Sequence, residues 1–212
     1  MAPRPKATPR TAAHGERFGA EYYRRFYDDP TTRVGDRATV RKLADFVAAY
    51  LRYLDVPVRS ILDVGCGQGH WRGAAAAVWP RAKYHGVENS EYLCEQFGWI
   101  RGSAVDFVPR KATGQSSFDL VVCQGVLQYL DDRAAARAIA NLARWCRGAL
   151  YLEALTTLDW QQNVDRSRTD GDVHLRTGDW YRNLLERHFV ACGGGVFCSR
   201  RAGVALFELE GN

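Results

Sequence analysis

A glycine-rich run directly after a short apolar segment carries the residues best suited to chemistry. Residues 60–64 read Ser-Ile-Leu-Asp-Val and are followed by Gly65, Gly67 and Gly69. Glycine adopts a positive φ without strain, and it lets the backbone come close to a ligand. A buried strand, a glycine loop and a following helix are typical of a site for a nucleoside cofactor. We expect that a side chain at Gly65 or Gly67 would occupy the space of this cofactor.

Two carboxylates near this loop indicate which cofactor it binds. Glu88 comes roughly twenty residues after the loop, at the end of the next predicted strand, where a carboxylate accepts hydrogen bonds from both ribose hydroxyls. Asp63 precedes the first glycine by two residues. A carboxylate at that position repels a pyrophosphate but attracts an ammonium group. The charges therefore favour S-adenosylmethionine, which has an ammonium group, a sulfonium and no phosphate, over a nicotinamide dinucleotide.

Alternating strands and helices position these residues. The pattern runs from residue 60 to residue 154 and predicts parallel βαβ units with right-handed crossovers. Ligands of such a sheet bind at the carboxyl ends of its strands, where the glycine loop and Glu88 both fall. Near the C-terminus, residues 189–199 and 203–210 read as two strands that are close enough to form a hairpin.

Several segments, taken together and in order, resemble class I S-adenosylmethionine-dependent methyltransferases of the small-molecule type. The first segment resembles motif I of that family, and the second resembles the acidic end of its second strand. The others look like its third-strand motif, its fourth-strand motif with the residues that follow, and its fifth helix. These segments are residues 61–69, 87–89, 100–104, 118–130 and 174–185, and the resemblance spans about residues 38–210.

The resemblance implies an α/β fold with a mostly parallel seven-stranded sheet, helices on both faces, a C-terminal antiparallel β-hairpin and an N-terminal helical cap. It also implies S-adenosylmethionine as cofactor and S-adenosylhomocysteine as product. Ser103 departs from the family pattern, which often has an aspartate there for the adenine amino group. A hydroxyl, a backbone carbonyl or Asp106 would then take that role. The implied cofactor-binding residues are Asp63, Gly65, Cys66, Gly67, Gly69, Trp71, Glu88, Asn89, Ser90, Gly102, Ser103, Ala104, Cys123, Gln124, Gly125, Leu127 and Tyr23.

The catalytic and substrate-binding residues follow from position rather than from a motif. Alignment of a methyl donor with its acceptor alone supplies roughly 7–11 kcal/mol, so no single catalytic side chain is obligatory. A hydroxyl acceptor benefits from a general base, for which His174 and Glu153 are the candidates. His174 also fits a surface loop histidine, and Glu153 also fits a loop cap. The substrate-binding candidates are Tyr22, Tyr27, Trp160 and Asp159.

Length and composition suit one folded domain with a short extension. The chain has 212 residues, of which 46% are hydrophobic and 25% charged. We expect a disordered basic arm over residues 1–15 and a single methyltransferase domain over residues 16–212. Within this domain we expect an N-terminal helical cap over residues 16–57 and a polar, irregular lid or substrate loop over residues 156–178.

Charge, cysteine and hydropathy patterns restrict the partners. The net charge is +5, but the folded region has no dense Lys/Arg run and no nucleic-acid-binding motif, so we do not expect a nucleic-acid substrate. We expect no membrane span and no signal peptide, and the six cysteines form no CxxC pair. These features indicate a cytoplasmic protein with reduced thiols, either a monomer or a homodimer. Scattered carboxylates indicate a metal-independent enzyme.

We therefore expect methyl transfer from S-adenosylmethionine to an oxygen or nitrogen of a small-molecule metabolite. The chain reads Cys-Gln-Gly-Val over residues 123–126, without the NPPY-type tetrapeptide of nucleic-acid amino methyltransferases. A pocket enclosed by the cap and the 156–178 loop favours a small substrate. Two alternatives remain: a protein or RNA methyltransferase that docks through the basic arm, and a catalytically inactive S-adenosylmethionine-binding module.

Overall fold

The fold is that of a computed structural model, which describes residues 17–28 and 36–206. The predicted basic arm over residues 1–15 lies outside the described residues, as does part of the predicted cap, residues 29–35. None of the described helices combines the length and the apolar character that a membrane crossing requires.

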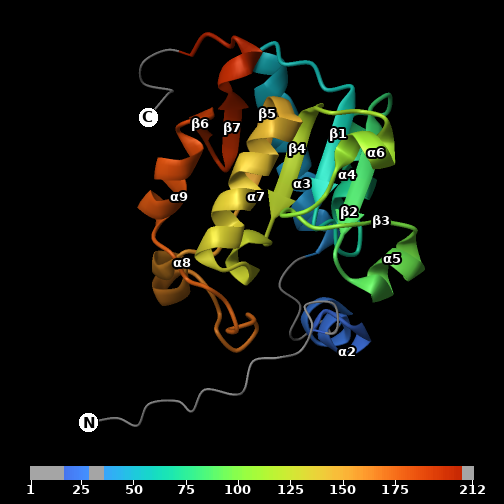
Figure 1. The fold of residues 1–212 in the computed structure, drawn as a ribbon, viewed down its shortest axis with the longest axis vertical. Coiled ribbons are helices and arrows are strands. Elements are labelled where there is room, and N and C mark those ends of the chain that lie inside the picture. The colour runs from blue at the N-terminus through green and yellow to red at the C-terminus, as the bar shows by residue number, and fades with distance from the viewer. Residues whose placement is uncertain (1–16, 29–35, 207–212) are drawn as a thin grey trace.

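A seven-stranded sheet forms the centre of the molecule (Figure 1). Its order is β3-β2-β1-β4-β5-β7-β6, and all neighbours from β3 to β5 are parallel, whereas β7 is antiparallel to both β5 and β6. This arrangement confirms the predicted fold. The strands are β1 (Ser60–Val64), β2 (Lys83–Glu88), β3 (Ile100–Arg101), β4 (Phe118–Gln124), β5 (Cys146–Glu153), β6 (Phe189–Gly193) and β7 (Val196–Ser199).

The C-terminal hairpin corrects one sequence prediction. Both of its strands lie within residues 189–199, which we had read as a single strand. Gly193, Gly194 and Gly195 adopt φ values of 87°, 57° and 78°, and they reverse the chain between β6 and β7. Three consecutive glycines make this reversal possible without strain. The second strand predicted at 203–210 is wrong over residues 203–206, which are not in a strand, and residues 207–210 are outside the described range.

Helices cover both faces of the sheet because successive residues of its buried strands point to opposite sides. Ile61 packs with α3 and α4 on one face, whereas Leu62 packs with α7 and α9 on the other. The helices are α2 (Ala20–Tyr23), α3 (Arg37–Tyr53), α4 (His70–Val78), α5 (Glu91–Phe97), α6 (Pro109–Thr113), α7 (Asp132–Trp145), α8 (Thr157–Gln162) and α9 (Gly178–Leu185). A π-helical turn (Arg24–Asp28) and two 3-10 helices (Leu127–Tyr129 and Arg200–Ala202) complete the set.

Polar side chains fix where several helices begin. Ser90 accepts a hydrogen bond from the backbone N–H of Leu93 at the start of α5, and Asp131 accepts one from Ala134 at the start of α7. Such caps satisfy backbone donors that have no partner inside the helix. Thr177 caps α9 in the same way, by accepting a hydrogen bond from the backbone N–H of Trp180.

Two peripheral segments lie at the carboxyl end of the parallel strands. Figure 1 shows α2 and α8 at the end of the molecule toward which β4 points. The prediction that residues 156–178 are irregular is wrong for α8, which begins at a capping box formed by Thr156 and Asp159. Arg17, which precedes α2, forms an ion pair with Asp170, which follows α8, at 3.0 Å between Nη2 and Oδ2.

Candidate functional site

The glycine loop after β1 has the backbone that the sequence predicted. Gly65, Gly67 and Gly69 all adopt positive φ, at 75°, 52° and 76°. A Cβ at Gly67 would meet no atom within 4 Å, so this position faces open space. A Cβ at Gly65 would lie 2.3 Å from Cγ2 of Val126. Our expectation for Gly67 therefore agrees with the geometry, whereas Gly65 is constrained by packing against Val126.

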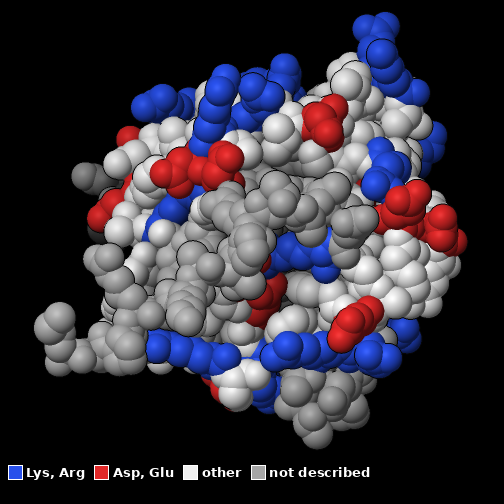
Figure 2. Space-filling view, turned by 60° about the horizontal axis from the view of Figure 1, so that its bottom comes forward, with Lys and Arg blue, Asp and Glu red and all other residues white. Residues whose placement is uncertain are grey.

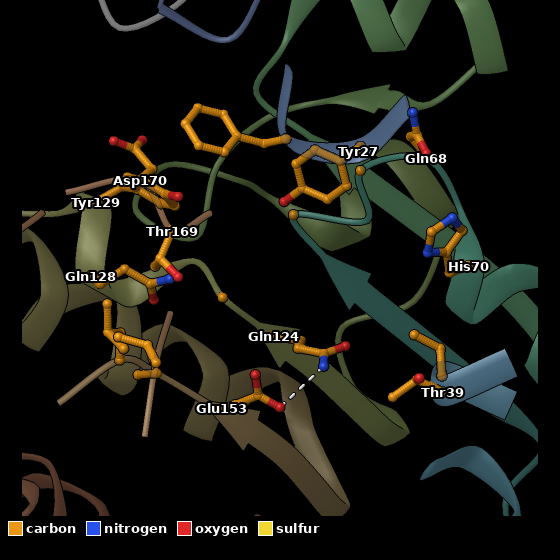
Figure 3. A pocket seen from close by; sticks show the side chains of 18 of the residues that line it. Tyr27, Thr39, Gln68, His70, Gln124, Gln128, Tyr129, Glu153, Thr169 and Asp170 are labelled. Atoms are coloured by element: carbon orange, nitrogen blue, oxygen red, sulfur yellow. Dashed lines mark hydrogen bonds between the residues drawn. The ribbon is translucent and has the colours of Figure 1, made fainter. Parts of the chain in front are cut away.

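A cavity of about 840 Å³ opens beside this loop (Figure 3). Its size falls within the range of roughly 300–1,000 Å³ that is usual for small-molecule pockets. Figure 2, which brings this end of the molecule forward, shows acidic surface recessed near its centre, with basic side chains both close to it and toward the border. The predicted site residues that line the cavity are Tyr22, Tyr27, Asp63, Gly65, Cys66, Gly67, Trp71, Gln124, Gly125, Glu153 and Asp159.

Asp63 is the carboxylate of the cavity nearest to the glycine loop in sequence. Its side chain is almost fully buried and accepts a short hydrogen bond from the hydroxyl of Tyr84. Burial raises the pKa of Asp63 to about 7; the bond from Tyr84 opposes this shift, and the negative charge of Glu88 adds to it. A cationic ligand group next to Asp63 would favour its ionised form.

Glu88 does not line the cavity, although it lies at the end of β2 as predicted. Its Oε2 accepts a hydrogen bond from the N–H of Gly67 at 2.9 Å, and its Oε1 accepts from the N–H groups of Asn89 and Ser90 at 2.8 and 2.9 Å. The carboxylate is 6% exposed. In this structure Glu88 therefore ties the glycine loop to the end of β2, and its role toward a ribose stays a prediction.

Tyr23 of α2 is buried close to Glu88. It packs in a buried cluster with Cys66, Leu93 and Trp99. Burial, followed by the negative charge of Glu88, raises the pKa of the Tyr23 hydroxyl. Trp99 donates from Nε1 to the carbonyl oxygen of Gly67 at 2.8 Å. Both the N–H and the carbonyl group of Gly67 therefore take part in hydrogen bonds, the N–H with Glu88 and the carbonyl with Trp99.

A chain of hydrogen bonds crosses the cavity from α4 to β5. Trp71 Nε1 donates to Gln124 Oε1 at 2.8 Å, and Gln124 Nε2 donates to Glu153 Oε2 at 3.1 Å (Figure 3). Tyr151 donates its hydroxyl to the same oxygen of Glu153 at 3.0 Å. Among the described residues, none donates to Glu153 Oε1. The chain fixes the orientation of the Gln124 amide and leaves one carboxylate oxygen for a ligand.

His174, the other candidate base, does not line the cavity. Its backbone N–H donates to the carbonyl oxygen of Gln128 at 2.8 Å. Its side chain lies near Asp131, whose pKa is held low first by the N–H of Ala134 and also by the charge of His174. The structure therefore brings Glu153, but not His174, together with the glycine loop.

The remaining predicted residues lie off the main cavity. Ala104, Cys123 and Leu127 are buried in the core on the α7 side of the sheet. Ser103 donates from its N–H and its hydroxyl to Asp106 Oδ1, at 3.0 and 2.7 Å. Trp160 lines a second cavity of about 480 Å³ instead. The others outside the main cavity are Tyr23, Gly69, Glu88, Asn89, Ser90 and Gly102.

Sequence reasoning missed Gln128 and Tyr129 as residues that line the cavity. Gln128 is 8% exposed, and its buried Oε1 has no hydrogen-bond partner among residues 17–28 and 36–206. The hydroxyls of Tyr129 and Tyr22 lie 2.8 Å apart, which joins α2 to the 3-10 helix after β4. The available signal was a polar amide within the otherwise apolar segment 126–130.

The sequence of the central strands and helices is similar to that of a known family. Residues 61–148 match the model of a family described as a methyltransferase domain. The matched residues include the glycine loop, β2, β4 and α7, and the match agrees with the predicted assignment. No curated protein sequence matches the chain.

Solved structures of methyltransferases share the fold of this chain at low sequence identity. Magnesium protoporphyrin IX methyltransferase from Synechocystis PCC 6803, with bound SAH (S-adenosylhomocysteine), has a TM-score of 0.60 at 18% identity over 89% of this chain and 93% of that chain. The plantazolicin methyltransferase BpumL, in complex with SAH, has a TM-score of 0.54 at 15% identity over 71% and 63%. An O-methyltransferase family protein from Burkholderia thailandensis has a TM-score of 0.54 at 15% identity over 79% and 59%.

Proposed function

We propose that this protein transfers a methyl group from S-adenosylmethionine to an oxygen or nitrogen of a small-molecule metabolite. The observation that carries the proposal is Gly67, where a positive φ of 52° and open space beyond the missing Cβ coincide at the edge of the 840 Å³ cavity. The methyltransferase family match covers this loop.

The residues present fit the cofactor at its amino-acid end. Asp63, Gly65 and Gly67 line the cavity, and a buried carboxylate there suits the ammonium group. When bound, S-adenosylmethionine supplies an electrophilic methyl group on a sulfonium. The ribose role of Glu88 requires this buried carboxylate to become accessible, and Tyr23 of α2 lies close enough for its hydroxyl to be affected by the charge of Glu88.

The chain's own residues provide a position for the acceptor. Glu153 lines the cavity with one oxygen that accepts no bond from the described residues, so it can accept a proton from an acceptor group. Gln124 and Tyr151 hold this carboxylate in place. Aromatic side chains of the cap, among them Tyr22 and Tyr27, line the cavity and reduce the access of water.

A small-molecule acceptor is supported by the enclosure of the cavity. Residues of the N-terminal cap and of the 156–178 segment line it on the side away from the sheet. Two structures with the same fold are described as methyltransferases of magnesium protoporphyrin IX and of plantazolicin, neither of which is a nucleic acid. This likeness favours a small acceptor but does not select its chemistry.

Thermal unfolding in the presence of S-adenosylhomocysteine tests the cofactor directly. A ligand at 100 times its dissociation constant stabilises a protein by about 2.7 kcal/mol, which raises the midpoint by roughly 5–11 °C at this chain length. NADH serves as the control ligand and should cause no rise. Methyl transfer to an acceptor pool, followed with a labelled methyl group, then distinguishes an enzyme from an inactive binding module.

A pair of glycine variants shows whether the shift arises at the loop. Gly67→Ala places a methyl group in the open space and should abolish the rise. Gly114→Ala is the matched control, because Gly114 also has a positive φ, at 74°, and no atom within 4 Å of a Cβ, but does not line the cavity. An equal rise in both variants, or no rise in the unmodified protein, would contradict the proposal.

A further inference from the structure

The cavity has an unequal balance of charged side chains. The described residues that line it include one guanidinium, that of Arg168, and six carboxylates. His70 also lines it, but burial lowers the pKa of this imidazole and leaves it uncharged at neutral pH. The six carboxylates are those of Asp36, Asp63, Glu153, Asp159, Asp165 and Asp170.

Most of this negative charge lies away from the glycine loop. Asp63 ends β1 and is accounted for by the ammonium group of the cofactor. Glu153 belongs to β5, and three further carboxylates belong to the 156–178 segment. Figure 3 shows Glu153 and Asp170 on the opposite side of the cavity from Gln68, within the glycine loop, and His70, directly after it. On that side the carboxylates of the described residues outnumber the guanidinium of Arg168, which belongs to the same segment.

Two of these carboxylates are held in the ionised form by local hydrogen bonds. The hydroxyl of Thr156 is the main cause that lowers the pKa of Asp159, and the hydroxyl of Ser167 does the same for Asp165. Asp170 is balanced by Arg17. Glu153 is different, because its bonds come only from the neutral groups of Gln124 and Tyr151.

A buried amide on the same side points independently to a ligand with donors. Gln128 Oε1 has no hydrogen-bond partner within the part of the chain that the structure describes, and the residue is more than nine-tenths buried. Figure 3 shows its amide end directed into the cavity. A buried acceptor without a partner destabilises the protein until a donor reaches it. Among the described residues, none donates to the buried Gln128 Oε1 or to Oε1 of the more exposed Glu153.

Aromatic rings complete a site suited to a cation. Tyr22, Phe26, Tyr27 and Tyr129 all line the cavity. The faces of such rings attract an ammonium group, and the attraction grows when water is excluded. Carboxylates, an unsatisfied acceptor and aromatic faces together match the three properties of a protonated amine: its charge, its N–H donors and its weakly hydrated alkyl groups.

We infer that the acceptor substrate carries a basic amine, which binds as an ammonium group to the part of the cavity that contains Glu153 and Gln128. The inference rests on the proposed function in one respect: it takes the amine to be the substrate that accepts the methyl group. The binding site itself is independent of that assignment. An alcohol or a carboxylate in the place of the amine lacks the charge that Glu153 requires.

Matched probe molecules test the inference by binding rather than by turnover. We would use 2-phenylethylamine, 2-phenylethanol and 3-phenylpropionate, together with tryptamine, tryptophol and indole-3-propionate. Each probe is titrated by thermal unfolding and by calorimetry, with and without saturating S-adenosylhomocysteine. We expect the amines to raise the unfolding midpoint and the alcohols and carboxylates to leave it unchanged.

Two variants assign the binding to the named residues. Glu153→Gln keeps the shape of the side chain and should weaken amine binding about tenfold, which corresponds to about 1.4 kcal/mol. Glu91→Gln is the matched control on α5, where the side chain is exposed and does not line the cavity, and it should bind amines normally. If Glu153→Gln does not fold, Gln128→Met removes the second acceptor with little change in volume.

The outcomes separate this inference from the proposed function. Equal or stronger binding of the alcohols or carboxylates, unchanged amine binding in both cavity variants, or no amine binding at all would overturn the inference. If S-adenosylhomocysteine still stabilises the protein in those cases, the proposed function stands. Amine binding without any effect of S-adenosylhomocysteine would support the amine site and contradict the methyltransferase proposal.

Discussion

The carboxylate of Glu88 accepts a hydrogen bond from the backbone N–H of Gly67 at 2.9 Å. The residue predicted to bind the ribose therefore also holds the glycine loop in its left-handed conformation. Removing the Glu88 side chain would disturb the loop together with any ribose contact. A test of cofactor binding is better made at Gly67, and Glu88 is better tested for stability.

Glu88→Gln should destabilise the protein even without a ligand. The amide of glutamine retains one acceptor oxygen, and its NH₂ group faces a backbone donor that the carboxylate now satisfies. Loss of a hydrogen bond to a charged group costs about 1.5–3 kcal/mol, which lowers the unfolding midpoint by about 3–12 °C. Differential scanning calorimetry measures this shift, with Glu91→Gln as the exposed control. An unchanged midpoint would show that the bonds to the loop contribute nothing.

The affinity for S-adenosylhomocysteine should rise with pH as Asp63 ionises. The pKa of Asp63 is about 7 in the free protein, so at lower pH the side chain is mainly protonated and neutral. The ligand's ammonium group binds the ionised form, and ligand binding therefore has to displace a proton below pH 7. The affinity should fall by up to about tenfold per pH unit below that value and level off above it. Calorimetry from about pH 5.5 to 8 would measure the trend.

Asp63→Asn provides the control for this pH dependence, because an amide does not titrate. Its affinity should be lower than that of the unmodified protein at pH 8 and should vary little with pH. The same pH dependence in both proteins would assign the titration to another group and remove Asp63 from the cofactor site.

The hydroxyls of Tyr22 and Tyr129 should be energetically coupled. They lie 2.8 Å apart and form a hydrogen bond between α2 and the 3-10 helix after β4. Tyr22→Phe and Tyr129→Phe should each destabilise the protein, and the double variant should cost less than the sum. We expect a coupling free energy of about 0.5–1.5 kcal/mol in a double-mutant cycle by chemical denaturation. Additive effects would mean that the two hydroxyls act separately.

Two glycine-to-alanine variants should change stability in opposite directions. A Cβ at Gly86 on β2 would lie 2.5 Å from the ring of Trp99, so Gly86→Ala should cost about 1–3 kcal/mol. A Cβ at Gly73 on α4 would meet no atom within 4 Å, and Gly73→Ala should stabilise the helix by about 0.5–1 kcal/mol. Thermal unfolding of both variants under one buffer condition measures the contrast. Destabilisation at Gly73 would contradict the open space on that face of α4.

Local signals explain why the glycine loop and the parallel sheet were predictable. The positive φ values at Gly65, Gly67 and Gly69 follow from residues that neighbour one another in sequence. The parallel sheet follows from the alternation of strands and helices. Gln128, by contrast, gains its importance from long-range packing against elements that no short pattern relates to it. The C-terminal hairpin was misplaced because three glycines inside an apolar run reverse a chain that the alternation alone would extend.

Tyr22 and Tyr23 are adjacent in α2 but face different compartments. Tyr22 lines the cavity, whereas Tyr23 is buried against Cys66 and the Glu88 side of the loop. A rotation of this short helix that uncovers Glu88 must therefore also change the shape of the cavity. Helix α2 therefore borders both the cavity and the buried region around Glu88. A ligand that binds in one of these regions and moves α2 also changes the other, so binding of ligands to the two regions is thermodynamically linked.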